Sequence, residues 1–119
     1  SVVIDGSFAT YTPAANYFGD DNFTFSVSDG LESSSANVSV SVSAVNDAPV
    51  LASVSDVSFD EDGSGSVSLT ADDVDGDDLS YNVTGGSSIL ASLDSNVATF
   101  NAPQDYNGSE QFTVSVTDG

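Results

Sequence analysis

Residues 23–30 read Phe-Thr-Phe-Ser-Val-Ser-Asp-Gly, and this stretch decides the fold class. Large apolar side chains alternate with hydroxyl side chains, and an Asp-Gly pair ends the run. Successive side chains of a strand point to opposite faces of the sheet, so this alternation predicts a half-buried antiparallel strand. Asp-Gly is a turn signal. We therefore expect a second strand over residues 35–44, where Val38, Val40 and Val42 alternate with polar side chains.

The same stretch returns 89 residues later, where residues 112–119 read Phe-Thr-Val-Ser-Val-Thr-Asp-Gly. Residues 5–11 match residues 94–100 at the same offset, and residues 17–19 match residues 106–108. A constant offset indicates an internal repeat. The sequence thus predicts two parts of a tandem repeat of about 89 residues: residues 1–48 form the C-terminal part of one repeat, and residues 49–119 form the N-terminal part of the next, without its last strand.

Short strands are expected along the rest of the chain, separated by acidic or glycine-rich turns. They cover residues 1–4, 7–12, 56–59, 66–71, 79–84, 88–93, 96–101 and 111–117, with a linker over residues 45–50 that contains Pro49. Strands at this spacing, without a helical pattern, predict an all-β sandwich of the immunoglobulin type. A part repeat without its last strand would expose a sheet edge, where another chain can pair.

Residues 72–78 read Asp-Asp-Val-Asp-Gly-Asp-Asp, and no Lys, Arg or His anywhere in the chain can neutralise them. Neighbouring carboxylates repel one another. A bound cation would relieve that repulsion, and Ca²⁺ suits the loop better than Mg²⁺ because it accepts six to eight oxygen ligands in a flexible shell. An EF-hand is excluded, since its glycine falls on Asp78 and its last glutamate on Thr84. The alternative is a solvated acidic turn.

Composition excludes several classes of function. The formal charge of −19 argues against nucleic acid and anionic membranes, and no apolar run approaches the roughly 18 residues of a spanning helix. Without Cys or His, disulfides and the usual zinc ligand sets are unavailable. An enzyme is not expected, because no basic side chain could support a catalytic pair of carboxylates. The absence of Met suggests a segment of a longer protein.

The chain resembles the bacterial cadherin-like tandem repeat of large secreted or surface-attached adhesins, including the RTX type. The resemblance rests on residues 11–13, 23–30, 38–42, 45–50 and 73–81, which follow one another in the order that is typical of such repeats. It covers nearly the whole chain and implies a seven-stranded Greek-key sandwich that serves as a spacer in a filament or adhesin.

The resemblance also implies calcium at the junction between consecutive domains. The linker would supply Asn46 and Asp47, and the next domain would supply Asp73 and Asp75, with Asp77 beside them, and Asp118. Asp29 is the equivalent of Asp118 in the first repeat, and Glu61 or Asp62 would serve the following junction. Two departures predict fewer ions than an animal cadherin holds: Ala44 replaces the first linker Asp, and the Leu-Asp-Arg-Glu ligand segment has no counterpart near residues 14–17.

Two functions follow as hypotheses. The first is a calcium-stiffened structural repeat, secreted or on the bacterial cell surface, whose partners are neighbouring repeats or head-to-tail copies. The second is a calcium-dependent module that binds a polysaccharide or another cell-surface ligand through exposed aromatic side chains. The candidate aromatic residues are Tyr11, Tyr17, Phe18, Tyr81, Phe100 and Tyr106.

Overall fold

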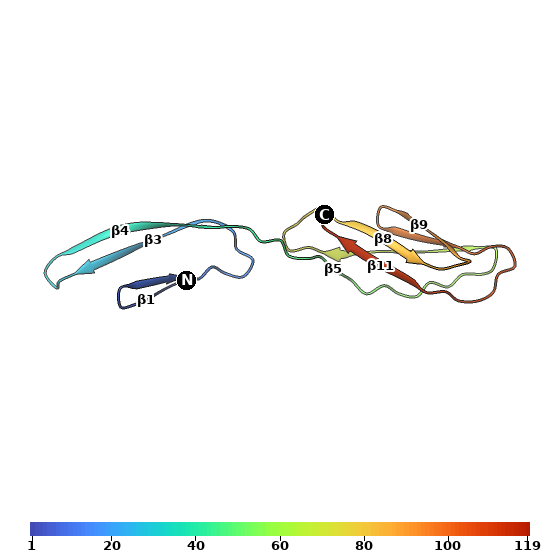
Figure 1. Cartoon of the computed structure of the whole chain (residues 1–119), viewed down its shortest axis with the longest axis horizontal. Helices are drawn as coiled ribbons and strands as arrows, with labels where there is room; N and C mark the ends of the chain where they lie inside the picture. Colours follow the sequence, from blue (N-terminus) through green and yellow to red (C-terminus); the bar gives the residue numbers. More distant parts are fainter. The chain divides into compact units, whose positions relative to one another are not determined.

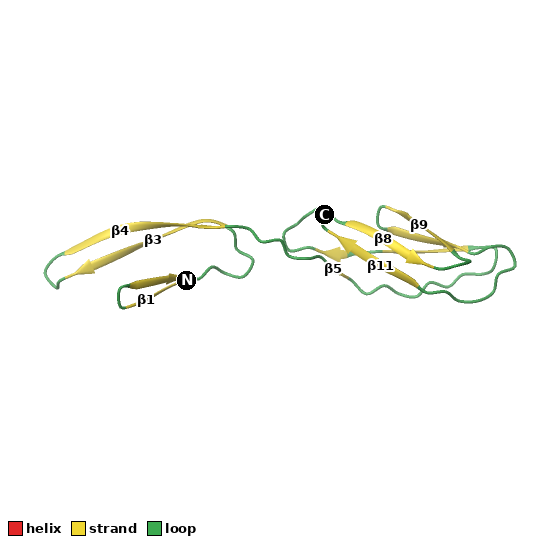
Figure 2. Cartoon of the chain, in the orientation of Figure 1, coloured by secondary structure: helices red, strands yellow, loops and turns green.

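Every regular element of the protein is a β-strand, as the computed structural model of residues 1–119 shows (Figure 2). The strands are β1 (Val2–Asp5), β2 (Phe8–Tyr11), β3 (Gly19–Ser28), β4 (Ser33–Val42), β5 (Val50–Leu51), β6 (Ser64–Ser68), β7 (Ala71–Asp72), β8 (Ser80–Gly85), β9 (Leu90–Asp94), β10 (Val97–Asn101) and β11 (Phe112–Thr117). By their contacts, the residues form two compact units, Ser1–Asn46 and Asp47–Gly119, which we call unit 1 and unit 2.

Unit 1 consists of two antiparallel hairpins, β1–β2 and β3–β4 (Figure 1). The β3–β4 ladder is the longest in the chain and runs from Gly19 opposite Val42 to Ser28 opposite Ser33. The Tyr11 hydroxyl donates a 2.7 Å hydrogen bond to Oδ2 of Asp21, which joins the two hairpins. No side chain of unit 1 is buried, and Val3, Ile4 and Phe8 are more than 60% exposed. Unit 1 therefore has apolar faces but no core of its own.

Unit 2 is a β-sandwich. One main sheet has the strand order β6-β10-β9, the other pairs β11 with β8, and β5 and β7 form a short separate sheet. The chain passes from one sheet to the other between β8 and β9 and again between β10 and β11. This crossing pattern, and the absence of any helix, confirm the predicted all-β sandwich class.

The core of unit 2 lies between these sheets. Leu69, Ala98 and Phe100 are buried, and half-buried side chains from both sheets pack around them, among them Val67, Val83 and Val114. The rings of Phe100 in β10 and Phe112 in β11 lie 4.8 Å apart at 58°, a tilted contact that aromatic rings favour. Because β10 and β11 belong to different sheets, this pair ties the two layers together.

Three predicted elements differ from the structure. Residues 56–59 form no strand, although Val57 and Phe59 are half-buried against the core as the alternation predicted, because no neighbouring strand pairs with their backbone. Conversely, Val50 belongs to β5, not to a linker, since Val50 and Leu51 pair with Asp72 and Ala71. The strand expected over residues 66–71 is divided into β6 and β7.

Candidate metal centre

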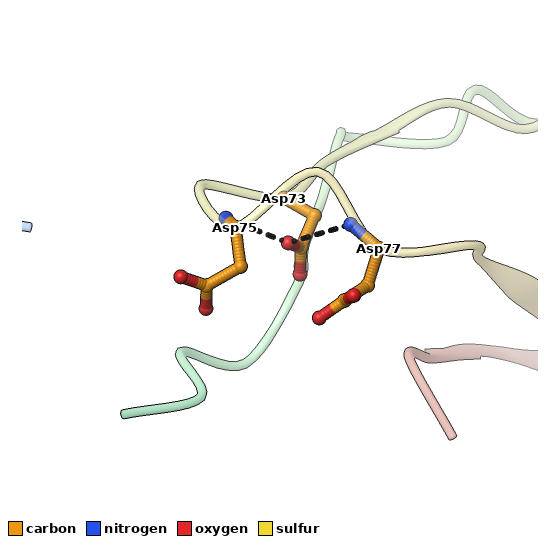
Figure 3. A group of neighbouring side chains, drawn as sticks. All are labelled: Asp73, Asp75 and Asp77. Carbon is orange, nitrogen blue, oxygen red and sulfur yellow. Dashed lines mark hydrogen bonds between the residues drawn. The ribbon is translucent and has the colours of Figure 1, made fainter. Parts of the chain in front are cut away.

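The acidic loop connects β7 to β8 and is built around Asp73 (Figure 3). Oδ1 of Asp73 accepts the backbone N–H groups of Asp75 at 2.9 Å, Gly76 at 2.9 Å and Asp77 at 3.4 Å. Gly76 has φ +80°, a conformation that glycine adopts without steric cost. An Asp side chain that accepts hydrogen bonds from the N–H groups of the residues after it stabilises a local turn. One oxygen of Asp73 therefore holds the loop in shape.

The carboxyl groups of Asp73, Asp75 and Asp77 converge. Each can offer one oxygen within 4.8 Å of the others, and Figure 3 shows the three groups on the same side of the loop. Asp73 and Asp75 are half-buried, while Asp77 is exposed. Oδ2 of Asp73 is inaccessible to solvent and has no hydrogen-bond partner. A buried carboxylate oxygen is costly without a partner, so this atom fits a bound cation.

The start of unit 2 reaches this loop. The backbone N–H of Asp47 donates a 2.7 Å hydrogen bond to Oδ2 of Asp75. Asp47 is the first residue of unit 2, and Asn46 is the last residue of unit 1. The structure therefore brings the backbone of Asp47 to the cluster, while ligation by the side chains of Asn46 and Asp47 stays a prediction.

The other predicted ligands lie outside the cluster of three. Oδ1 of Asp29 accepts the N–H groups of Leu31 at 2.9 Å and Glu32 at 2.8 Å, so it shapes the turn between β3 and β4. These bonds, with that from Glu32 first, lower the pKa of Asp29. Asp118 is half-buried directly after β11. Glu61 is exposed in the turn before β6. Metal binding by these three residues stays a prediction.

Glu110 has a structural function that the sequence reading missed. Its carboxylate accepts the backbone N–H groups of Ser87 at 2.7 Å, Ser88 at 2.9 Å and Ile89 at 3.1 Å. It also accepts the hydroxyl of Tyr106 at 3.3 Å. The bond from Ser87 contributes most to lowering the pKa of Glu110 to about 2. An acid follows the repeated tyrosine by four residues in both repeats, as Asp21 and Glu110, and this recurrence was the available signal.

Three of the four tyrosines proposed for sugar stacking, Tyr11, Tyr17 and Tyr106, make internal hydrogen bonds. The hydroxyl of Tyr11 bonds to Asp21, which raises the pKa of Tyr11 to about 12. The hydroxyl of Tyr17 donates to the backbone oxygen of Asp20 at 2.9 Å. Phe100 is a core residue. The polysaccharide hypothesis gains no support from these positions.

Comparison with protein families places the chain. The model of the bacterial Ig domain family matches residues 1–41 and residues 46–119. The chain therefore belongs to the bacterial Ig domain family, which agrees with the resemblance to bacterial cadherin-like repeats. Neither the curated proteins nor the solved structures gave a match.

Membership of this family gives a coarse function. Its domains are generally structural modules, not enzymes, and typically belong to extracellular or surface proteins. The chain is accordingly a structural repeat of the kind found in surface proteins. No helix in the structure has the length and apolar character needed to cross a membrane.

Proposed function

We propose that this chain is a calcium-stiffened spacer repeat of a secreted or cell-surface adhesin or filament. The observation that carries the proposal is Oδ2 of Asp73, a solvent-inaccessible carboxylate oxygen without a hydrogen-bond partner, at the centre of three converging carboxyl groups. The residues that would hold the ion are Asp73, Asp75 and Asp77, with Asn46, Asp47 and Asp118 as further ligands implied by the cadherin resemblance.

Calcium fits this donor set better than the other common divalent ions. All the available donors are oxygens, which excludes the nitrogen and sulfur ligands that zinc usually takes. Three carboxyl groups of one short loop form an irregular shell, which Ca²⁺ tolerates and Mg²⁺ does not. The ion would also offset part of the −19 charge, whose self-repulsion opposes a compact state.

Stiffening follows from the position of Asp47. An ion held by Asp75 would fix the carboxyl group that already accepts the N–H of Asp47. That residue is where unit 2 begins, directly after the last residue of unit 1. Calcium would therefore reduce the freedom of the backbone at the passage from one repeat to the next.

The affinity expected for such a site predicts where the repeat would bind calcium. Extracellular calcium modules bind at about 10⁻⁴–10⁻³ M. At a hundredfold excess over the dissociation constant, binding to the folded state alone would stabilise it by about 2.7 kcal/mol. The repeat would thus be loaded outside the cell, where calcium is abundant, and empty before export.

The test is thermal unfolding of the chain in calcium, in magnesium and in EDTA, with small-angle scattering of a tandem protein of several repeats in the same solutions. We expect a calcium-specific rise of the melting temperature and a longer maximum dimension with calcium. A melting temperature that is equal in all three solutions would leave the acidic loop as a solvated turn. A rise without any change in dimension would keep the site and reject its stiffening function.

A further inference from the structure

Strand β9 forms an open edge of the β6-β10-β9 sheet. On one side it pairs with β10, from Leu90 opposite Asn101 to Asp94 opposite Val97, and on the other side it pairs with no strand. A strand at a sheet edge presents unpaired backbone N–H and C=O groups to any chain that aligns with them. The second edge of β9 is therefore a surface on which a further strand can pair.

This open edge does not depend on the residues that follow Gly119. Unit 1 shows where the next strand of a repeat lies, because β4 follows the Asp29-Gly30 turn and pairs with β3 alone. β3 is the equivalent of β11 at the offset of 89, and β11 belongs to the other main sheet of unit 2. A strand in the place of β4 would therefore extend the sheet of β11 and leave β9 uncovered.

The edge of β9 lacks the features that keep such edges apart in most proteins. Natural edge strands carry charges, proline or a bulge. β9 reads Leu-Ala-Ser-Leu-Asp, with Asp94 at its end as its only charge, and its register with β10 runs without a bulge. Residues 79–93 contain no acidic side chain, although the chain has 19. Two acidic copies can thus approach each other along this edge with little repulsion.

We propose that β9 is the contact through which two copies of this chain associate, by antiparallel pairing with β9 of the second copy. Antiparallel pairing of a strand with itself gives a two-fold symmetric contact, the commonest symmetry of protein dimers. Ser92 is the middle residue of β9. Alignment of the two whole strands therefore places Ser92 opposite Ser92 and Leu90 opposite Asp94, and joins the two sheets into one.

This register suits both faces of the joined sheet. Ala91 and Leu93 pack against the core of their own copy, and each would lie opposite the other across the contact, so that the apolar layer continues between the copies. On the outer face, the two Asp94 carboxylates would be four residues apart along the strands, or about 13 Å. That distance exceeds the screening length of about 8 Å at 0.15 M salt. The edge of β8 is less suited, because β8 closely follows the acidic residues 72–78.

The same edge strand recurs in the first repeat. β1 is the equivalent of β9 at the offset of 89, pairs only with β2, and reads Val-Val-Ile-Asp, again without charge before its last residue. A tandem array would thus offer this edge once in each repeat. One short contact is weak, but many linked contacts raise the overall affinity by orders of magnitude. The kind of partner that fits is a second molecule of the same array, whose paired repeats run in the opposite direction.

The absence of cysteine makes disulfide trapping a direct test. Ser92→Cys in the full chain would place two thiols opposite each other, at the Cα separation of about 4.4–6.8 Å that a disulfide needs. Under mild oxidation, we expect a disulfide-linked dimer to form at least about tenfold faster than with Ser115→Cys, because the pairing holds the thiols together. Ser115 is equally exposed, but lies on β11 in the other sheet. Equal rates would mean random collision and would overturn the proposal.

Two further variants, Leu90→Cys and Asp94→Cys, test the register. In the proposed pairing, each of these residues lies about 13 Å from the same residue of the second copy, beyond the reach of a disulfide, whereas Leu90 of one copy lies opposite Asp94 of the other. We expect a mixture of the two variants to form the mixed dimer in preference to both symmetric dimers. A random distribution of the three dimers would reject the proposal.

All these reactions are performed in EDTA and at about 0.15 M salt. The contact along β9 includes none of the acidic residues 72–78, so trapping should not require calcium. The proposal is thereby separated from the calcium function, and either one can fail alone.

Discussion

The backbone N–H of Asp47 lies 2.7 Å from Oδ2 of Asp75, across 28 residues of sequence. This bond closes the acidic loop against the first residue of unit 2. The carboxyl group of Asp75 thus has two roles in one place, since it holds the entering chain and contributes to the cluster of Asp73, Asp75 and Asp77. Loading of the cluster with a cation should therefore be felt in the stability of the whole unit.

Asp73→Asn separates the charge of the cluster from its geometry. Asparagine keeps an oxygen that can accept the N–H groups of Asp75, Gly76 and Asp77, so the loop should retain its shape. The cation, however, would lose its central charged ligand. We expect the calcium-induced rise in melting temperature, roughly 10 °C or more in the wild type at saturating calcium, to fall to near zero, as measured by calorimetry.

The control is Asp78→Asn. It removes the same charge from the same acidic stretch, but from a residue outside the cluster. It should preserve most of the calcium response. In EDTA, both variants should be as stable as the wild type or slightly more so, because each relieves carboxylate repulsion. A calcium response that survives in Asp73→Asn would contradict the placement of the ion.

Glu110 should make unit 2 sensitive to acid. Its carboxylate is stabilised by the N–H groups of residues 87–89, and its pKa in the folded protein is about 2, below the ordinary value of 4.5. A lowered pKa contributes stability above the unfolded value, and that stability is lost as the pH falls towards the folded value. Glu110→Gln should therefore lower stability at pH 7, and the difference from wild type should shrink between pH 4.5 and pH 2.

Urea unfolding at several pH values measures this difference directly. Glu61→Gln changes the other glutamate of unit 2, which is exposed in a turn, and should alter stability little at any pH. A Glu110→Gln variant whose deficit stays constant down to pH 2 would mean that the contribution of Glu110 does not depend on its charge.

Local patterns made the long strands predictable, and contacts distant in sequence account for what was missed. The alternation around Phe25, Val40 and Val114 is a property of neighbouring residues, so β3, β4 and β11 followed from the sequence. β5 did not, because Val50 and Leu51 become a strand only by pairing with Asp72 and Ala71, about twenty residues later. The error over residues 56–59 has the same origin, since a suitable pattern forms no strand without a partner.

The candidate metal centre was also predictable only in part, for the same reason. The density of carboxylates in residues 72–78 pointed to a cation from sequence alone. The separate tasks of the two oxygens of Asp73, one bound to three N–H groups and the other buried without a partner, depend on how the loop folds. The hydrogen bonds from residues 87–89 to Glu110 likewise form only when the sandwich brings together segments more than twenty residues apart in sequence.

Leu69→Ala should test where the stability of unit 2 resides. Leu69 is fully buried between the sheets, and its truncation leaves a cavity that surrounding side chains fill only in part. We expect a loss of about 2–5 kcal/mol in the free energy of unfolding, measured by urea denaturation. Leu90→Ala removes the same atoms from a side chain that is 72% exposed and should cost less than about 0.5 kcal/mol. Equal losses at the two positions would contradict the assigned core.

The two units should differ sharply when they are separated. Residues 47–119 contain a buried core and the hydrogen bonds that Glu110 accepts from residues 87–89. We therefore expect a cooperative thermal transition. Residues 1–46 contain two hairpins without a buried side chain, and isolated two-stranded hairpins are at best marginally stable in water. Their circular dichroism should therefore lack a cooperative transition. A cooperative melt of the isolated segment 1–46 at low concentration would show that its two hairpins stabilise each other without a buried core.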